Sequence, residues 1–234
     1  MKRFIVAAIV LVVLVSCKKQ HPVNVFVDPR FNDTKAPVEQ QINKIAVLRF
    51  ASSLNHQDDP DGVAPRTLEK YLDQGLAERK DYKFIAPNTV DYAVEQNQWA
   101  DAYAKCLQSY ANTDKPDMKF LGELARQLQC DAFLIPVVDL WQKDEVDIME
   151  NATPATYVGA TITVVDANDG TMLFRATDED YIEGARSETA DRSLVTSGSG
   201  AVYADLGKKV HRAPPFEEVA IKVARSLAAS LPAR

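Results

Sequence analysis

Residues 156–176 read TYVGATITVVDANDGTMLFRA, and this stretch decides the fold class. Apolar side chains stand at every second position on both sides of a polar centre, at Val158, Ala160, Ile162, Val164, Met172, Phe174 and Ala176. A period of two residues is typical of a strand with one buried face. The intervening segment 166–170 supplies the Asp, Asn and Gly residues that tight turns prefer. The stretch therefore predicts a β-hairpin.

Strand and helix patterns alternate on either side of the hairpin. Short apolar runs predict further strands at 44–50, 82–86 and 131–138. Pro136 cannot donate to a strand ladder, so the last of these is expected at a sheet edge or at a bulge. Apolar residues at helical spacing predict helices within 65–76, 88–94, 99–110, 118–128 and 215–231.

The order of these elements predicts the architecture. A strand, a helix, a second strand, further helices, a third strand, the hairpin and a closing helix are typical of an α/β protein. We expect a mixed-sheet α/β sandwich that forms one domain over residues 42–234. A long connection at 183–213 contains SGSG at 197–200 and is expected to be functional or disordered.

The N-terminus carries the pattern of an export signal. Lys2 and Arg3 precede an apolar run at 4–15, which as a helix would be about 18 Å long. A spanning helix must cross about 30 Å of hydrocarbon, so residues 1–16 are expected to be a signal peptide. Residues 14–17, LVSC, resemble the bacterial lipobox, which implies that Cys17 is acylated and becomes the first mature residue. The alternative is an ordinary cleaved signal with an incidental cysteine.

Residues 17–41 read as a flexible tether between the lipid and the domain. They are polar and contain Pro22, Pro29 and Pro37. Within them, 23–27 is apolar enough to add a strand to a partner or to the edge of its own domain. Lys follows Cys17 where Asp would signal retention in the inner membrane of enteric bacteria. The expected location is the periplasmic face of the outer membrane, with the bilayer bound through the acyl chains.

Composition narrows the function further. The chain has 27 basic and 33 acidic side chains, a net charge of −6, and loss of Lys2 and Arg3 with the signal makes it −8. An acidic chain without a basic cluster argues against nucleic acid as a partner. The two remaining cysteines, Cys106 and Cys130, are expected either to form a disulfide in an oxidising compartment or to be buried free thiols.

Three stretches resemble a family of periplasmic α/β modules. Residues 44–50, KIAVLRF, resemble the opening strand of the family, 121–134 its helix and central strand, and 164–173 its hairpin. The family includes the N-terminal domain of TolB, the curli-secretion lipoproteins and the lipoprotein that activates a penicillin-binding protein. The resemblance implies a role in protein–protein contact within an envelope machine. Only 154–178 alternates for the length of a transmembrane strand, which argues against the curli-type pore.

Catalytic and metal-binding motifs are not found in the sequence. The three histidines have no ligand spacing, the acidic run at 58–62 fails the calcium-loop pattern, and no nucleophile stands in a known context. We therefore expect no enzyme activity, no cofactor and no metal. The leading hypothesis is a periplasmic adaptor or regulatory factor that binds an envelope protein. A secretion-pore subunit and an auxiliary lipoprotein of a transporter are the alternatives.

Two aromatic residues are candidates for the contact surface. Trp141 follows the strand that is expected at the sheet edge, and Tyr157 begins the hairpin. Tyr and Trp are favoured anchors of protein interfaces. A place in the core is the favoured alternative for both side chains.

Overall fold

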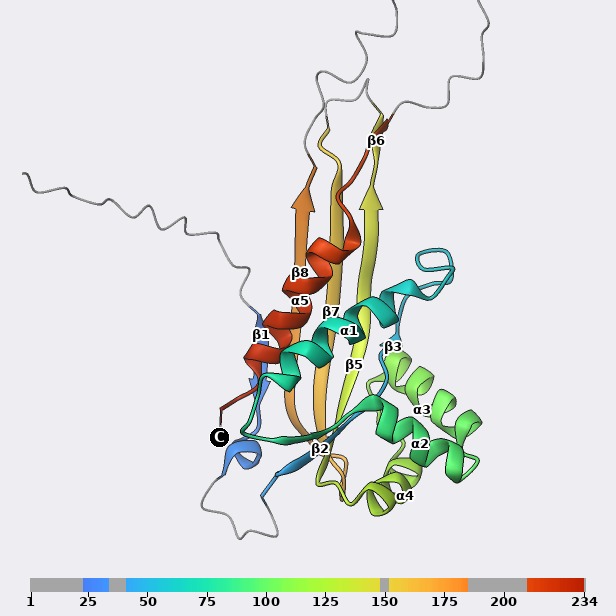
Figure 1. Ribbon diagram of the computed structural model, residues 1–234, viewed down its shortest axis with the longest axis vertical. Coiled ribbons are helices and arrows are strands. Elements are labelled where there is room, and N and C mark those ends of the chain that lie inside the picture. Colours follow the sequence, from blue (N-terminus) through green and yellow to red (C-terminus); the bar gives the residue numbers. More distant parts are fainter. Residues whose placement is uncertain (1–22, 34–40, 148–151, 185–209, 234) are drawn as a thin grey trace, which may run out of the picture.

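The computed structural model describes residues 23–33, 41–147, 152–184 and 210–233 (Figure 1). The strands are β1 Asn24–Val27, β2 Lys44–Val47, β3 Ala51–Ser52, β4 Lys83–Ile85, β5 Ala132–Asp144, β6 Val146–Asp147, β7 Ala155–Asp166, β8 Met172–Glu183 and β9 Val210–His211. The helices are α1 Val63–Ala77, α2 Pro87–Gln96, α3 Ala100–Thr113, α4 Met118–Leu128 and α5 Phe216–Ser230, with the 3-10 turn η1 at Pro29–Asn32.

Seven strands form one mixed sheet in the order β1-β8-β7-β5-β2-β4, and β3 also pairs with β5. The neighbouring pairs β1/β8, β8/β7 and β7/β5 are antiparallel. The pairs β5/β2, β5/β3 and β2/β4 are parallel. Helix α1 connects β2 to β4, as a parallel pair requires. The predicted α/β fold with a mixed sheet is confirmed.

The β7–β8 hairpin forms where the sequence predicts it and is longer than predicted. Its twelve-residue strands stay paired from Val165 and Met172 to Ala155 and Glu183. Gly170 has a φ of +73°, a conformation that costs a glycine little. Asp166 accepts a hydrogen bond from the Asn168 amide at 2.8 Å, which fixes the turn.

Helices cover the two faces of the sheet unequally (Figure 1). Helices α1 and α5 pack on one face along its length, over side chains from β2, β5, β7 and β8. Helices α2, α3 and α4 pack on the other face near one end of the sheet, where the core includes Phe133, Ile135, Val137 and Val165. The remainder of this second face carries no helix among the described elements.

Strand β5 lies inside the sheet, so the prediction that Pro136 marks an edge is wrong. The Leu134 carbonyl accepts from Leu48 and the Val138 carbonyl accepts from Ser53, so alternate residues of β5 face β2 and β3. Pro136 falls between these two contacts, at the gap between β2 and β3. Its missing N–H therefore costs no ladder bond. The predicted bulge does occur, two residues further on, between Val138 and Leu140.

Part of the expected tether belongs to the domain. Strand β1 pairs with β8 and forms an edge of the sheet. Phe31 in η1 is buried and stacks on Tyr82, with ring centroids 5.6 Å apart and planes 4° from parallel. The same ring lies 5.8 Å from that of Phe174. Phe31 thus anchors the segment 23–33 in the core beneath α1 and α5.

Candidate functional site

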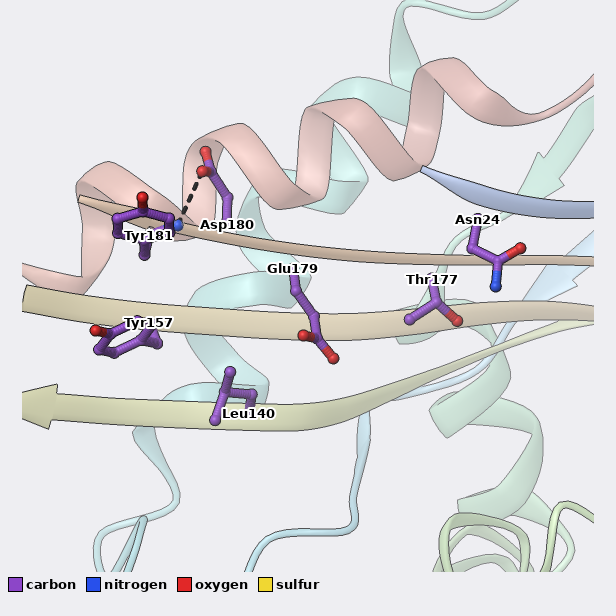
Figure 2. Close-up of a pocket in the computed structure, with 7 residues that line it drawn as sticks. All are labelled: Asn24, Leu140, Tyr157, Thr177, Glu179, Asp180 and Tyr181. Carbon is purple, nitrogen blue, oxygen red and sulfur yellow. Dashed lines mark hydrogen bonds between the residues drawn. The ribbon is translucent and has the colours of Figure 1, made fainter. Parts of the chain in front are cut away.

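The helix-free part of the second sheet face holds a shallow hollow of about 490 Å³. Strands β5, β7 and β8 supply its floor, and β1 supplies its rim (Figure 2). We call this surface the open face, and define it by the side chains that line the hollow on this side, which are Asn24, Leu140, Tyr157, Thr177, Glu179 and Tyr181. Because a sheet presents alternate residues to each face, these side chains share one side.

Two tyrosines form the aromatic part of the open face. Tyr157 of β7 stands directly opposite Tyr181 of β8 in the ladder. Their rings stack with centroids 5.6 Å apart and planes at 26°. Tyr181 is 42% exposed, and Tyr157 is partly buried. The pair is a stacked aromatic surface that offers apolar area to a partner.

A glycine next to the tyrosines lets an acidic side chain lie across the sheet. Gly159 of β7 stands opposite Glu179 of β8. A Cβ atom at Gly159 would lie 2.9 Å from the Glu179 Cγ and 3.0 Å from the Leu140 Cβ. The missing side chain therefore gives the Glu179 stem room to cross β7 towards Leu140 (Figure 2). The result is a carboxylate held beside an aromatic pair.

Polar side chains separate the open face from the core under α3. Thr161 donates from Oγ1 to the Asp139 carboxylate at 2.5 Å, and its Oγ1 lies 2.9 Å from the Thr177 Oγ1. Arg175 forms an ion pair with Asp114 at the end of α3, at 3.1 Å. These bonds fix the positions of the side chains at the end of the hollow that is nearer to α3. At this end, hydrogen bonds and an ion pair therefore hold the side chains beside the open face in place.

The carboxylates of β8 are divided between the two faces. Asp178 is buried, with 6% of its surface exposed. Asp180 points to the same side as Asp178, and its carboxylate lies 3.8 Å from Lys222 of α5. Asp180 borders the hollow as well, but of these three acidic residues only Glu179 points its side chain to the face that carries the tyrosines. Within 178–180, Glu179 therefore has no second carboxylate on its own face of the strand.

The sequence candidates for partner contact fall in different places. Tyr157 lies on the open face, as described. Trp141 is 5% exposed and stacks on Phe216 of α5, with ring centroids 4.1 Å apart. The bulge at Val138/Leu140 turns Trp141 towards α5, so the structure gives it a place in the core. Cys17 and 185–209 of the expected loop lie outside the described residues.

The two cysteines are free and buried. Burial raises the pKa of the Cys106 thiol to about 11 and that of the Cys130 thiol to about 12. A reactive cysteine needs a lowered pKa and access to solvent. Of the two alternatives left open by the sequence, the structure has the free thiols, and neither suits nucleophilic catalysis.

A charged cluster at the end of β2 could not be read from the sequence. Arg49 forms ion pairs with Glu69 of α1 and with Asp91 of α2. Its backbone N–H donates to the Tyr103 hydroxyl at 2.9 Å, and burial raises the pKa of this tyrosine. The guanidinium is fully engaged by these partners and Asn88. The cluster therefore ties three helices to β2, and we assign it a structural role.

Metal chemistry has no candidate among the described residues. They contain no group of three or more His, Cys, Asp or Glu side chains that could hold an ion. In the acidic run at 58–62, Asp59 accepts from the amides of Val63 and Ala64, at 2.8 and 3.0 Å. This carboxylate therefore satisfies amide groups at the start of α1. In the same ranges, no helix has the length and apolar character needed to span a bilayer.

Comparisons with known proteins give a likeness of fold. No protein-family model and no curated protein matches the sequence. Among solved structures, lipoprotein GNA1162 from Neisseria meningitidis is 17% identical with a TM-score of 0.43, over 65% of this chain and 89% of that chain. The PelC dodecamer from Paraburkholderia phytofirmans is 15% identical with a TM-score of 0.41, over 91% of this chain and 98% of that chain.

A third structure is the LpoB C-terminal domain from Salmonella enterica. It is 12% identical with a TM-score of 0.34, over 59% of this chain and 82% of that chain. All three TM-scores are below 0.5, so the resemblance to a family of periplasmic modules stays a prediction from the sequence. Identities this low say nothing of activity or partner.

Sequence reasoning missed most of the open face. It identified Tyr157 but not Tyr181, Glu179 or Gly159. The signal was present in the hairpin, because continued pairing beyond Ala176 places Tyr181 opposite Tyr157. The exposure of these residues depends on where helices pack, and no local pattern reports that.

Proposed function

We propose that this chain is a non-catalytic lipoprotein of the bacterial outer membrane, and that its open face binds a protein of the cell envelope. The observation that carries the proposal is the stacked Tyr157–Tyr181 pair in a hollow that no described helix covers. Tyrosine supplies large contact area at a small cost in conformational entropy and is enriched among residues that dominate binding energy.

The chemistry of the open face indicates what kind of partner it suits. Leu140 and the tyrosine rings offer apolar area, and Glu179 offers a negative charge beside them. A Lys or Arg side chain of a partner would lie over the rings and reach the carboxylate in one arrangement. The partner we propose therefore presents an apolar segment that includes a basic residue.

The anchor is the second part of the proposal. Acylation of Cys17 would hold the chain at the bilayer through buried methylene groups, each contributing about 0.8 kcal/mol. The described domain begins at Val23, six residues after Cys17. The domain would therefore face the periplasm and meet envelope proteins close to the membrane surface.

Site-specific photo-crosslinking in intact cells tests the open face. A photoreactive phenylalanine analogue replaces Tyr181 in the full chain, and Tyr92 on α2 is the matched control, because it is 64% exposed and lies away from the hollow. We expect a discrete crosslinked envelope protein from Tyr181 and none from Tyr92. That product should disappear when Tyr157 is changed to Ser in the same chain. Equal crosslinking from both positions would contradict the proposal.

A further inference from the structure

Strand β1 is an edge of the sheet with unusual chemistry. Its three apolar side chains are exposed, Val25 by 41%, Phe26 by 47% and Val27 by 41%. Proteins generally protect an edge with charged residues, proline or a bulge, because its free backbone groups can pair with another strand. Residues 24–27 contain no charge and no proline. This edge is therefore suited to receiving a strand.

The backbone of β1 determines which residues could pair outwards. The Asp28 N–H donates to the Leu173 carbonyl of β8 at 2.7 Å. In an antiparallel pair, alternate residues point their N–H and C=O groups to the same side. Asn24 and Phe26 therefore bond to β8, as Asp28 does. The N–H and C=O groups of Val25 and Val27 point away from the sheet.

This arrangement is complementary to itself. We infer that β1 pairs antiparallel with the β1 strand of a second copy of this chain, with Val25 opposite the partner's Val27. Each such pair exchanges two hydrogen bonds, and the two-fold axis makes two pairs. Phe26 then stands opposite the partner's Phe26 at a position without hydrogen bonds, where side chains are closest. An aromatic pair stabilises such a position.

The features of the edge favour a second copy over another protein. The register that uses both outward-facing valines is centred on Phe26, the middle of the stretch 24–28 that is bonded to β8. Residues 24–27 carry no charge, so the pairing brings no like charges together. On one face of the joined sheet each valine meets a valine, and on the other face Phe26 meets the Phe26 of the second copy. The two sheets would become continuous. Phe26 lies on the same side as Asn24, so the open faces of the two copies would lie side by side.

The pairing is expected to form at a membrane and not in dilute solution. A four-residue strand buries far less than the roughly 1,200 Å² of a stable interface. Asn24 lies seven residues after Cys17, at most about 25 Å of extended chain. Acylated copies would therefore hold their β1 strands in one shallow layer, where the effective concentration is high. The inference thus rests on the proposed anchor, but not on the proposed partner of the open face.

Disulfide trapping tests the pairing. Phe26→Cys is made in the full chain, expressed in a Gram-negative host, and the membrane fraction is examined on non-reducing gels. A non-hydrogen-bonded pair has Cα atoms about 4.5 Å apart, within the range that a disulfide accepts. We expect most of the variant to be a covalent dimer, and Tyr92→Cys, at a position that is more exposed than Phe26, to stay monomeric. The native thiols Cys106 and Cys130 are buried and do not interfere.

A pair of charge variants tests the register without a cysteine. The first variant combines Val25→Lys with Val27→Lys, which places like charges opposite each other and should abolish the dimer. Dimers are captured with a crosslinker that does not react with amines, so that the new lysines do not change the chemistry of capture. Val25→Lys with Val27→Glu places opposite charges in contact twice and should retain them. Both valines are exposed, so both variants should fold. Equal dimer yields from the two variants would overturn the register.

Other outcomes would overturn the inference in distinguishable ways. If Phe26→Cys traps a different protein, β1 serves a heterologous partner. If it traps nothing while a fluorophore at position 26 reports an apolar environment on phosphatidylethanolamine–phosphatidylglycerol vesicles, β1 contacts lipid instead. A chain that is not membrane-bound and stays monomeric would also overturn it. Crosslinks from Tyr181 are independent of each of these results.

Discussion

Replacing Phe31 with Ala should release the N-terminal segment from the domain. Phe31 is 3% exposed and contacts the rings of Tyr82 and Phe174. Truncation of a buried Phe to Ala costs about 3 to 5 kcal/mol. We use about 3 kcal/mol, since the segment is short and the site lies near the edge of the sheet. At 1.4 kcal/mol for each tenfold change, this corresponds to a loss of protection on the order of 100-fold.

Hydrogen exchange measures this loss directly. The amides of Asn24, Phe26 and Asp28 point to β8, so they exchange when β1 detaches. In Phe31→Ala these three amides should lose protection while those of β7 keep theirs. Tyr92→Ala, a truncation at an exposed site, should change the free energy of unfolding by less than about 0.5 kcal/mol. If the β1 amides in Phe31→Ala keep their protection within threefold, Phe31 is not the anchor.

Three further predictions concern the open face, Asp73 on α1 and the thiols. Gly159→Ala should lower the free energy of unfolding, measured in urea titrations, by about 1 kcal/mol, because the new Cβ would collide with Glu179 and Leu140. An unchanged stability would mean that the side chain of Glu179 does not lie across β7. Burial and Glu69 raise the pKa of Asp73 to about 6 in the fold, above its ordinary value of 3.8, so its ionisation destabilises the fold as the pH rises from about 4 to about 6. Asp73→Asn should therefore stabilise the protein at pH 7, by about 1 kcal/mol after solvent screening, and have no such effect at pH 3.5; a gain that is the same at both pH values would refute this cause. Both buried cysteines should react with a thiol reagent only in denaturant, and a mass 2 Da below that of the dithiol would instead reveal a disulfide.

Local pattern sufficed for the elements whose side chains alternate regularly. The hairpin at 155–183 and the strand at 44–47 were predictable, since period-two alternation and a short apolar run are properties of the segment itself. The amphipathic helices followed for the same reason. The order of the elements along the chain was enough to predict the α/β class.

The core place that the sequence favoured for Trp141 is confirmed, but the face of β5 on which this side chain lies was not predictable in this way. Counted from Val138 by strict alternation, Trp141 would face away from α5. The bulge between Val138 and Leu140 inserts one residue and reverses the side on which Trp141 lies. A bulge is set by pairing with β7 and β3, so a pattern read along β5 alone places this residue on the wrong face.

Edge and interior strands also depend on contacts distant in the sequence. Strand β5 is interior because β3 pairs with it after β2 ends, and β8 is covered because β1 returns to it across 150 residues. From the sequence, residues 23–27 could add a strand either to a partner or to the edge of their own domain. The structure has the pairing with their own domain. The open face exists because α2, α3 and α4 gather at one end of the sheet, which no single segment encodes.

The central claim is that this domain acts at a bilayer because Cys17 is acylated. Mass spectrometry of the mature N-terminal peptide, recovered from the membrane fraction of cells that express the full chain, tests it most directly. We predict a chain that begins at Cys17 and carries a diacylglyceryl group on its sulfur, and a Cys17→Ser variant that lacks this modification. A mature chain that begins at another residue, or an unmodified thiol at Cys17, would contradict the claim.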